Sequence, residues 1–389
     1  MSPDYAAAMR DPRIDKLAQV LVHYSVAVHR DDLVRVTGST VALPLIRALY
    51  RAVLLAGGHP LLRISDDQCQ DAFYELAGKR QLAFVGPLLK QEVEKIDCSI
   101  GIWANENTKS MTRVDPRRQA IVSQARKPIL KRFMERNALK GRKRLRWTGT
   151  QFPCQSAAQD AEMSLAQYED FVYTAGLLHL KDPPAEWRRI STAQQRVCDY
   201  LNKCREIRFK TPQGTDLRLG IAGRRWLNCD GHENFPDGEV YTGPVEDATT
   251  GVVGYSFPAV HGGREVHDIR LTFRAGKVVD ASASKGKEFL LKMLDQDRGA
   301  RVLGEIAIGT NYAITGYTKN TLFDEKIGGT FHAALGAAYP GSGGKNVSGL
   351  HWDMVCDLRR GGVIEADGKV ISASGRFTRA GWPQPTRTR

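Results

Sequence analysis

The chain has 389 residues, of which 42% are hydrophobic, and a formal net charge of +13 at neutral pH. This composition is typical of a globular protein with a sizeable core, and it excludes fibrous and disordered classes. The most apolar window, near residues 43–55, contains Arg47 and Arg51, so we expect no membrane-spanning helix. The N-terminal residues lack the apolar stretch of a secretory signal, and the seven cysteines form no CxxC pair. We therefore expect reduced thiols and a cytoplasmic protein that does not associate with membranes.

The first half of the sequence alternates helical patterns with short apolar runs. Helices are predicted at residues 12–24, 43–56, 69–76 and 187–202, and strands at residues 33–36, 59–64, 83–85 and 98–103. Alternation of this kind predicts an α/β domain with a mostly parallel sheet, which we place at residues 1–204. No glycine-rich fingerprint follows the first strand, so we expect no dinucleotide site.

A basic segment stands out within this half. Ten Lys or Arg residues lie between Arg126 and Arg146, against the single acid Glu135. Such a segment is either a phosphate-binding patch or the solvated face of a helix. The second interpretation is favoured by a possible buried stripe, and no stacking aromatics or zinc knuckle accompany the charge, so we do not expect nucleic acid as a partner. The stripe would consist of Leu130, Phe133, Met134 and Leu139.

The second half reads as strands separated by Gly, Asn and Asp turns, and we expect an α+β domain at residues 205–389. Residues 266–273 and 277–283 predict a hairpin, and further strands are expected at 301–308, 349–357 and 363–371. The last of these would fold at Asp367-Gly368. Helices are predicted at residues 285–295 and 323–338.

His351 and Asp353 stand two positions apart in one of these extended runs. Side chains alternate between faces along a strand, so both would project from one side, about 7 Å apart. An imidazole and a carboxylate on one face suit a divalent metal ion. A polar surface strand would give the same pattern.

Two glutamates precede this pair in the chain. Glu239 follows a turn at residues 235–238 and opens a short strand. Glu305 interrupts an apolar strand, where a carboxylate is costly unless it is paired or bound to a metal ion. A solvated position at a turn or at a sheet edge is the alternative for each.

Glu325, His332 and Tyr339 recur every seven residues. At 3.6 residues per turn, this spacing would place them along one face of the predicted helix at residues 323–338. A lone histidine on such a helix is also compatible with a purely structural role.

Together these positions offer glutamates, an aspartate and two histidines. The mixture is too rich in carboxylates for a structural zinc site. It suits two divalent ions about 3.5–4 Å apart that share a carboxylate and a water molecule. Such a centre predicts hydrolysis of an amide or an ester.

Five motifs stand in series around these residues. In chain order they are PDGEVYTGP (236–244), LGE (303–305), NTLFDE (320–325), HAALGAAYP (332–340) and HWDM (351–354). In this order they resemble the thermophilic-type metallo-aminopeptidases, peptidase family M29, which includes aminopeptidase T-like and S-like enzymes. Looser echoes at residues 56–60 and 157–164 extend the likeness over nearly the whole chain.

The resemblance implies an exopeptidase that acts on peptides with a free N-terminus, forms a homodimer and carries its metal centre in the C-terminal domain. It also implies two divalent metal ions per chain, variously zinc, cobalt, manganese or magnesium. By motif match the ligands would be Glu239, Glu305, His332, His351 and Asp353. Glu305 would bridge the ions, Tyr339 would hydrogen-bond the substrate carbonyl or its tetrahedral oxyanion, and Glu325 is a further catalytic candidate.

The sequence departs from the family pattern in two places. The interval between Glu325 and His332 is longer than in bacterial members, and the run after Asp353, residues 354–362, differs in a way that would alter the substrate pocket.

A branch of the same fold supplies an alternative function. Mononuclear iron dioxygenases acting on 2,5-dihydroxypyridine would use His332, His351 and Asp353 as a triad of two histidines and one carboxylate. That chemistry has no need of Glu239 and Glu305, so the peptidase interpretation is favoured.

Overall fold

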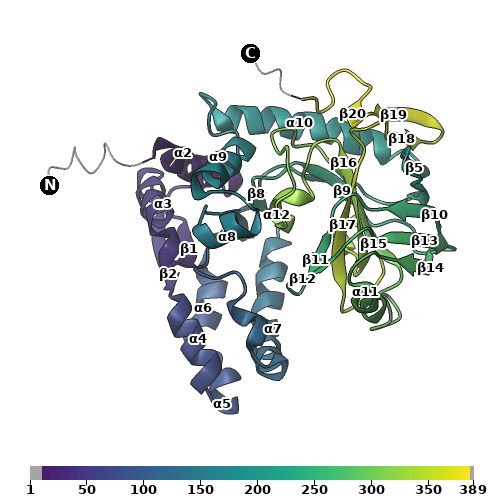
Figure 1. The fold of residues 1–389 in the computed structure, drawn as a ribbon. Coiled ribbons are helices and arrows are strands. Elements are labelled where there is room, and N and C mark those ends of the chain that lie inside the picture. The colour runs from purple at the N-terminus through teal and green to yellow at the C-terminus, as the bar shows by residue number, and fades with distance from the viewer. Residues whose placement is uncertain (1–10, 386–389) are drawn as a thin grey trace. The chain divides into compact units, whose positions relative to one another are not determined.

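The computed structural model describes residues 11–385, which fall into two compact units (Figure 1). The N-terminal unit comprises the chain up to Pro184 together with Gly231–Pro236, and the C-terminal unit comprises Ala185–Asp230 and the chain from Asp237 onward. Helix α10 (Pro183–Leu201), which the sequence pattern assigns to the first domain, therefore lies almost wholly in the C-terminal unit. Within residues 11–385, none of the helices combines the length and apolar character that crossing a membrane requires.

The N-terminal unit is built on a five-stranded sheet in the order β2-β1-β3-β4-β8, and every neighbouring pair is parallel. Its strands are β1 (Leu33–Ser39), β2 (His59–Ser65), β3 (Cys98–Trp103), β4 (Arg146–Gln151) and β8 (Asn234–Phe235). The central strands bury Val34, Val36 and Ile100 completely. The predicted α/β domain with a mostly parallel sheet is confirmed.

Helices separate these strands along the chain, as parallel pairing requires, and one helix, α2, precedes the first strand. They are α2 (Pro12–Val20), α3 (Leu43–Leu55), α4 (Asp67–Leu76), α5 (Lys79–Leu82), α6 (Pro87–Lys95), α7 (Pro116–Asn137), α8 (Gln155–Asp160) and α9 (Leu165–Ala175). Helix α3 is amphipathic: it buries Leu45 and Leu49 and exposes Arg47 and Arg51. The strand predicted at residues 83–85 is wrong, because this segment joins α5 to α6 and exposes Phe84.

Helix α7 carries much of the basic segment, and the stripe predicted for it is also wrong. Leu130 and Met134 are 63% and 50% exposed. The helix instead buries Val122 and Arg136. The Arg136 guanidinium donates to the carbonyl oxygens that end helix α6, at 2.6 and 2.9 Å.

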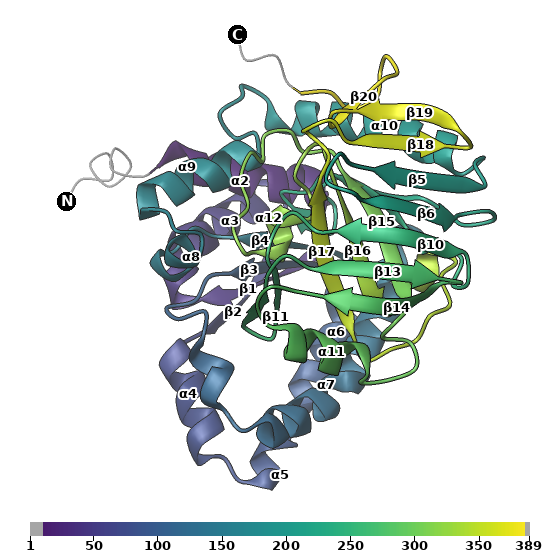
Figure 2. The ribbon, with the colours of Figure 1, turned by 45° about the vertical axis from the view of Figure 1, so that its right-hand side comes forward.

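The C-terminal unit contains an eight-stranded sheet, a five-stranded sheet and a short hairpin (Figure 2). The eight-stranded sheet orders β14 (Lys277–Ser282), β13 (Arg270–Arg274), β10 (Thr249–Gly254), β6 (Asp216–Gly220), β5 (Glu206–Lys210), β18 (Val363–Ala366), β19 (Lys369–Ala373) and β20 (Arg376–Phe377). The five-stranded sheet orders β17 (His351–Asp357), β16 (Thr330–Gly336), β15 (Leu303–Gly309), β9 (Glu239–Thr242) and β7 (Leu227–Cys229). The remaining elements are the hairpin β11 (Ala259–His261) and β12 (Arg264–Val266) and the helices α11 (Lys287–Leu294) and α12 (Thr321–Asp324). This α+β architecture is the one predicted for the C-terminal half.

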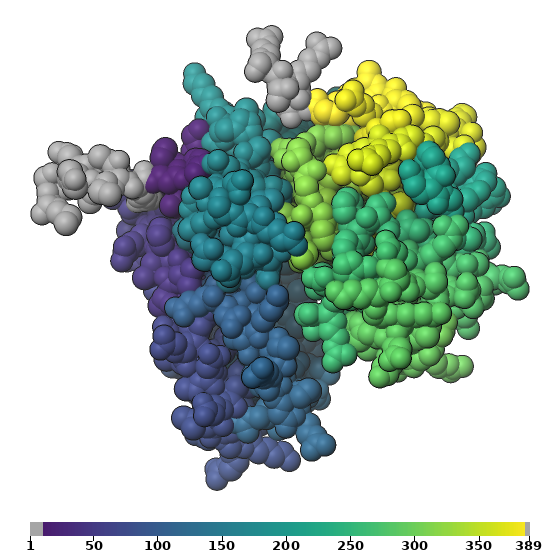
Figure 3. All heavy atoms as spheres, in the orientation of Figure 1, coloured from purple at the N-terminus to yellow at the C-terminus, as the bar shows by residue number. Residues whose placement is uncertain are grey.

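Two hairpins form where the sequence predicts turns. The β13–β14 turn places Ala275 and Gly276 at φ 45° and 80°, and the β18–β19 turn places Asp367 and Gly368 at φ 46° and 74°. Positive φ at both central residues is the geometry of a two-residue hairpin loop. The β18–β19 hairpin (yellow) lies on the surface of the C-terminal unit (Figure 3).

The two large sheets of the C-terminal unit share one hydrophobic core. Phe209 of β5 stacks on Phe331 of β16, with ring centroids 4.2 Å apart. Along β16 and β17, Leu335, Trp352 and Met354 also contribute to this core. Because side chains alternate along a strand, the intervening residues of β16 and β17 project from the opposite face.

The helix predicted at residues 323–338 is wrong. Only α12 (Thr321–Asp324) is helical there, and β16 follows as a strand whose residues are all buried. A strand buried on both faces shows no alternation, so periodicity cannot distinguish it from a buried helix. The break falls at Gly328-Gly329, where Gly329 has φ 84°.

Candidate metal centre

Adjacent strands of the five-stranded sheet bring the predicted ligands onto one face. In one row across the sheet, Glu305 of β15 pairs with Ala334 of β16, which pairs with Asp353 of β17. In the neighbouring row of this face, His332 pairs with Ala307. The small alanine side chains leave room between the polar ones, so an ion could be held directly above the sheet.

The two outer residues of the set lie opposite glycines. Glu239 of β9 pairs with Gly309, and His351 of β17 pairs with Gly336. A Cβ atom added to either glycine would lie 2.2 Å from a backbone oxygen. The structure thus brings together all five residues that the sequence predicts as ligands, although it places His332 on a strand.

Glu305 faces both imidazoles through different oxygens. Its Oε1 lies 3.3 Å from Nε2 of His332, and its Oε2 lies 3.7 Å from Nε2 of His351. The carboxylate is buried. Of the carboxylates that face both histidines through separate oxygens, Glu305 makes the shortest contact, to His332.

The other carboxylates also face the imidazoles. Asp353 lies 3.6 Å from His351 Nε2 through Oδ2 and 3.9 Å from His332 Nε2 through Oδ1, and Glu239 Oε2 lies 3.4 Å from His332 Nε2. Among the residues that the structure describes, Glu239 Oε2 and Asp353 Oδ1 are buried without a hydrogen-bond partner. Buried oxygens of this kind are costly unless a cation or another donor satisfies them.

Backbone carbonyls orient both imidazole rings. His332 Nδ1 lies 3.0 Å from the carbonyl oxygen of Glu325, and His351 Nδ1 lies 2.9 Å from that of Ala337. A proton on Nδ1 that is donated to a carbonyl leaves Nε2 free as a ligand, which is how proteins commonly fix histidines at metal sites.

The cluster binds protons strongly when no cation is bound. Burial would lower the pKa of His332, but the hydrogen bond that its ring donates to Glu305 and the charge of Glu239 raise it to about 10. Burial raises the pKa of Asp353 to about 6, and it raises the pKa of Glu305 and of Glu239 as well. Protons thus neutralise carboxylates that a metal ion would otherwise neutralise.

Lys326 belongs to this cluster but is not among the site residues predicted from the sequence. Its side chain is fully buried, its Nζ lies 3.2 Å from Glu239 Oε1, and it also donates to Glu325 Oε1. Burial would lower the pKa of Lys326, but Glu239 and Glu325 raise it well above 10.5, so the group remains an ammonium. Burial likewise tends to raise the pKa of Glu325, and the charges of Lys326 and His332 bring it below its usual value.

Cys229 and Asp237 form a further group with Glu239 that the sequence does not predict. Their candidate ligand atoms all lie within 4.8 Å of one another. Burial raises the pKa of both Cys229 and Asp237, which favours the thiol and the protonated acid. The only sequence signal is that Asp237 stands two residues before Glu239.

Tyr339 lies beside the imidazoles, beyond the end of β16. Its ring centroid is 5.1 Å from that of His351 and 5.7 Å from that of Tyr241, and the residue is 49% exposed. About half of the residue is therefore open to a molecule bound next to His351.

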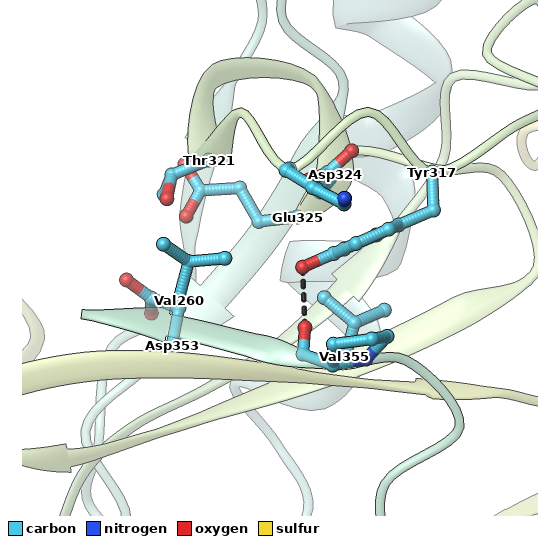
Figure 4. Close-up of a pocket in the computed structure, with 9 residues that line it drawn as sticks. Val260, Tyr317, Thr321, Asp324, Glu325, Asp353 and Val355 are labelled. Carbon is cyan, nitrogen blue, oxygen red and sulfur yellow. Dashed lines mark hydrogen bonds between the residues drawn. The ribbon is translucent and has the colours of Figure 1, made fainter. Parts of the chain in front are cut away.

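A pocket adjoins the cluster, and Glu325 and Asp353 belong to both (Figure 4). Figure 4 shows their carboxylates on one side of the pocket and the ring of Tyr317 on the other, where the Tyr317 hydroxyl donates to the Pro258 carbonyl. Val260 and Val355 supply apolar walls. Val355 belongs to the run at residues 354–362 for which the sequence predicts a departure from the family pattern.

The donor set fits divalent cations. Two overlapping groups, Glu239–Glu305–His332 and Glu305–His351–Asp353, each place three candidate ligand atoms within 4.8 Å of one another. Imidazole nitrogens combined with carboxylate oxygens suit zinc, cobalt, manganese or iron. The unpartnered oxygens of Glu239 and Asp353 are the further observation that favours a cation here.

Comparison with known proteins identifies the family and the fold of this chain. Aminopeptidase 2 of Geobacillus stearothermophilus is 26% identical over 360 residues, which cover 85% of this chain and 84% of the relative. The solved structure of wild-type AmpT from Thermus thermophilus has a TM-score of 0.80 and 24% identity, over 95% of this chain and 99% of that one. The structure of 2,5-dihydroxypyridine dioxygenase from Pseudomonas putida KT2440 has a TM-score of 0.58 and 12% identity, over 95% and 98% of the two chains. A family model described as thermophilic metalloprotease (M29) matches residues 10–377, and this chain therefore belongs to that family.

Proposed function

We propose that this chain is a metal-dependent aminopeptidase that releases N-terminal amino acids from peptides, using a water molecule activated between two divalent ions. The observation that carries this proposal is the position of Glu305, whose two oxygens face different imidazoles. A carboxylate shared in this way suits a pair of cations about 3.5–4 Å apart. The name of the Geobacillus stearothermophilus relative, an aminopeptidase, supports the same activity.

Each of the two overlapping ligand groups would bind one ion. Glu239 and His332 would hold one ion, His351 and Asp353 the other, and Glu305 would belong to both. When bound, zinc, cobalt, manganese or magnesium would act as a Lewis acid on the scissile carbonyl and would lower the pKa of a water molecule.

The chain's own residues supply the remaining steps. Glu325 is ionised and lines the pocket, so it is placed to take a proton from the attacking water and pass it to the leaving amine. Tyr339 would donate a hydrogen bond to the carbonyl oxygen as negative charge develops there. Val260 and Val355 would contact the side chain of the N-terminal residue.

The second candidate function is the iron-dependent dioxygenase. Nε2 of both histidines lies within 3.9 Å of Asp353, so a triad of His332, His351 and Asp353 is geometrically available. Glu239 and Glu305 lie in the same cluster, which favours the peptidase. Oxygen consumption with 2,5-dihydroxypyridine by protein carrying one iron ion per chain would reverse this ranking.

The proposal is tested by removing and restoring the metal. Hydrolysis of leucyl-p-nitroanilide should be lost after chelation and dialysis and should return with added Co²⁺ or Zn²⁺. N-acetyl-leucyl-p-nitroanilide, which lacks the free amine, is the matched control and should not be cleaved. Full activity of metal-free protein, or equal cleavage of the acetylated substrate, would contradict the proposal.

The oligomeric state and the cellular compartment of the protein remain predictions. We propose the homodimer expected from the family resemblance, and light scattering at several protein concentrations would measure it. Cytoplasmic residence is likewise a prediction, which fractionation of the source cells would check.

A further inference from the structure

Lys326 is the feature of this centre that the proposed activity does not yet use. It lies in the interval between Glu325 and His332, which the family resemblance predicts to be longer here than in bacterial members. A lysine side chain with no solvent exposure is uncommon, and it occurs where the charge is paired. Here both partners are carboxylates of the site.

The backbone of Lys326 is fixed on both sides. Its N–H donates to the carbonyl oxygen of Phe323, and its own carbonyl oxygen accepts from the N–H of Asn311, each at 3.0 Å. The backbone that carries the ammonium group is therefore fixed by hydrogen bonds on both sides.

The ammonium and the imidazole use different oxygens of Glu239. Oε1 lies 3.2 Å from Lys326 Nζ, whereas Oε2 faces His332 Nε2 at 3.4 Å and is the oxygen without a hydrogen-bond partner. Lys326 thus leaves the oxygen that faces the other ligands available. It contacts Glu325 through Oε1 as well, and Glu325 lines the substrate pocket.

We propose that Lys326 is a positioning residue of the metal centre, whose buried ammonium holds Oε1 of Glu239 and Oε1 of Glu325. Glu239 then directs its free oxygen at a cation, and Glu325 is held beside the pocket. This inference rests on the proposed metal-dependent activity, because it assigns Lys326 a role in that same site.

Charge explains why a lysine suits this place. Glu239, Glu305, Glu325 and Asp353 would bring four negative charges into one buried cluster when all are ionised. A compact ammonium can attract two of these carboxylates at once without the fixed fork of a guanidinium. A neutral side chain would leave Glu239 and Glu325 free to turn away from each other.

An alternative arrangement, in which the Lys326 ammonium occupies the position of a metal ion, predicts the opposite effect on metal binding. If Lys326 filled a cation position itself, removing its charge would open that position and increase the number of ions bound. The effect of Lys326→Met on metal binding therefore decides between the two arrangements.

The test compares metal-free wild type, Lys326→Met and the control Lys210→Met. Lys210 pairs with Glu365 on the other sheet of the same unit, so its replacement removes an ion pair away from the cluster. We expect Lys326→Met to weaken Co²⁺ binding, measured by calorimetry, by about 10- to 100-fold for at least one ion, as loss of an orienting partner does. With Co²⁺ in excess, kcat should fall while KM changes little. Lys210→Met should match the wild type.

The outcomes separate this inference from the proposed function. Unchanged or tighter Co²⁺ binding by Lys326→Met, with wild-type activity still metal-dependent, overturns the role of Lys326 alone. A wild type that binds no divalent ion overturns the proposed function instead. If thermal melting followed by circular dichroism shows that Lys326→Met does not fold, Lys326→Gln replaces it, with the same expectation of weakened binding.

Discussion

Glu305 Oε1 lies 3.3 Å from Nε2 of His332, and the second oxygen of the same carboxylate is directed at another imidazole. The two histidines come from neighbouring strands, β16 and β17, whose register also places Ala334 between Glu305 and Asp353. The shared carboxylate is thus a direct consequence of strand pairing. Under the proposed two-ion centre, the loss of Glu305 should therefore affect both ions.

Replacing Glu305 by Gln should remove this shared ligand while preserving volume. We expect kcat/KM for leucyl-p-nitroanilide to fall by at least about 10³-fold, or about 4 kcal/mol of transition-state stabilisation, and the bound metal to fall below the wild-type count. Elemental analysis and initial rates provide the two measurements. Glu288→Gln, on the exposed surface of α11, is the control and should behave as the wild type. Equal metal content in both variants would contradict the bridging role.

Metal affinity should rise with pH. In the metal-free protein the pKa of His332 is about 10 and that of Asp353 is about 6. Between these values His332 carries a proton that must leave before Nε2 can bind a cation, so affinity should increase by up to about tenfold per pH unit. Calorimetric titration with Co²⁺ in buffers of different ionisation enthalpy would count the released protons. Binding that releases none would refute the expectation.

The same pKa values predict how the stability of the metal-free protein depends on pH. A group whose pKa is raised by folding contributes stability that is complete below its unfolded pKa and is lost as the pH rises through its folded pKa. For His332 this window runs from 6.5 to about 10. The melting temperature of metal-free protein should therefore fall across this range, and His332→Gln should flatten the dependence. A melting temperature that rises over the window would show that the imidazolium is not stabilised by its neighbours.

The basic segment should not contribute to peptide hydrolysis. Several of its cations are already engaged, since Arg132 pairs with Glu94 at 2.6 Å and Arg136 donates to backbone carbonyls. We expect the combined replacement of Arg142, Lys143 and Arg144 by Gln to leave kcat/KM within about twofold. Retention of wild type on immobilised RNA or DNA that falls steeply with salt and disappears in the triple variant would instead indicate a nucleic-acid surface.

The sequence predicts which residues gather in the cluster because two of its rules are local. Alternation along a strand places His351 and Asp353 together whatever the rest of the fold, and a glutamate inside an apolar strand such as Glu305 requires a partner. The motif order then supplies Glu239 and His332. The parallel sheet of the first unit and the turns at Gly276 and Gly368 follow from equally local signals.

The wrong and missed predictions share one physical cause. The local sequence does not show which side chains tertiary contacts bury. Leu130 and Met134 have helical spacing but no neighbour that covers them. Lys326 looks like an ordinary surface lysine after Glu325, and only the meeting of β9 with the segment before β16 pairs it with Glu239. The run around His332 is rich in alanine and reads as a helix, whereas its glycines are the sign of a break.

Gly329→Ala tests this last point through the sign of its effect. In the structure Gly329 has φ 84°, and an added Cβ would lie 2.8 Å from the carbonyl oxygen of Gly375, so alanine should destabilise the protein by about 1–3 kcal/mol. A continuous helix through the same residue would instead gain about 1 kcal/mol from alanine. Gly316→Ala is the matched control, because a Cβ there meets nothing within 4 Å and should change stability by less than about 0.5 kcal/mol. Urea unfolding of the metal-free variants measures both changes in stability. A stabilising effect of Gly329→Ala would support the continuous helix instead and would contradict the placement of His332 on a strand.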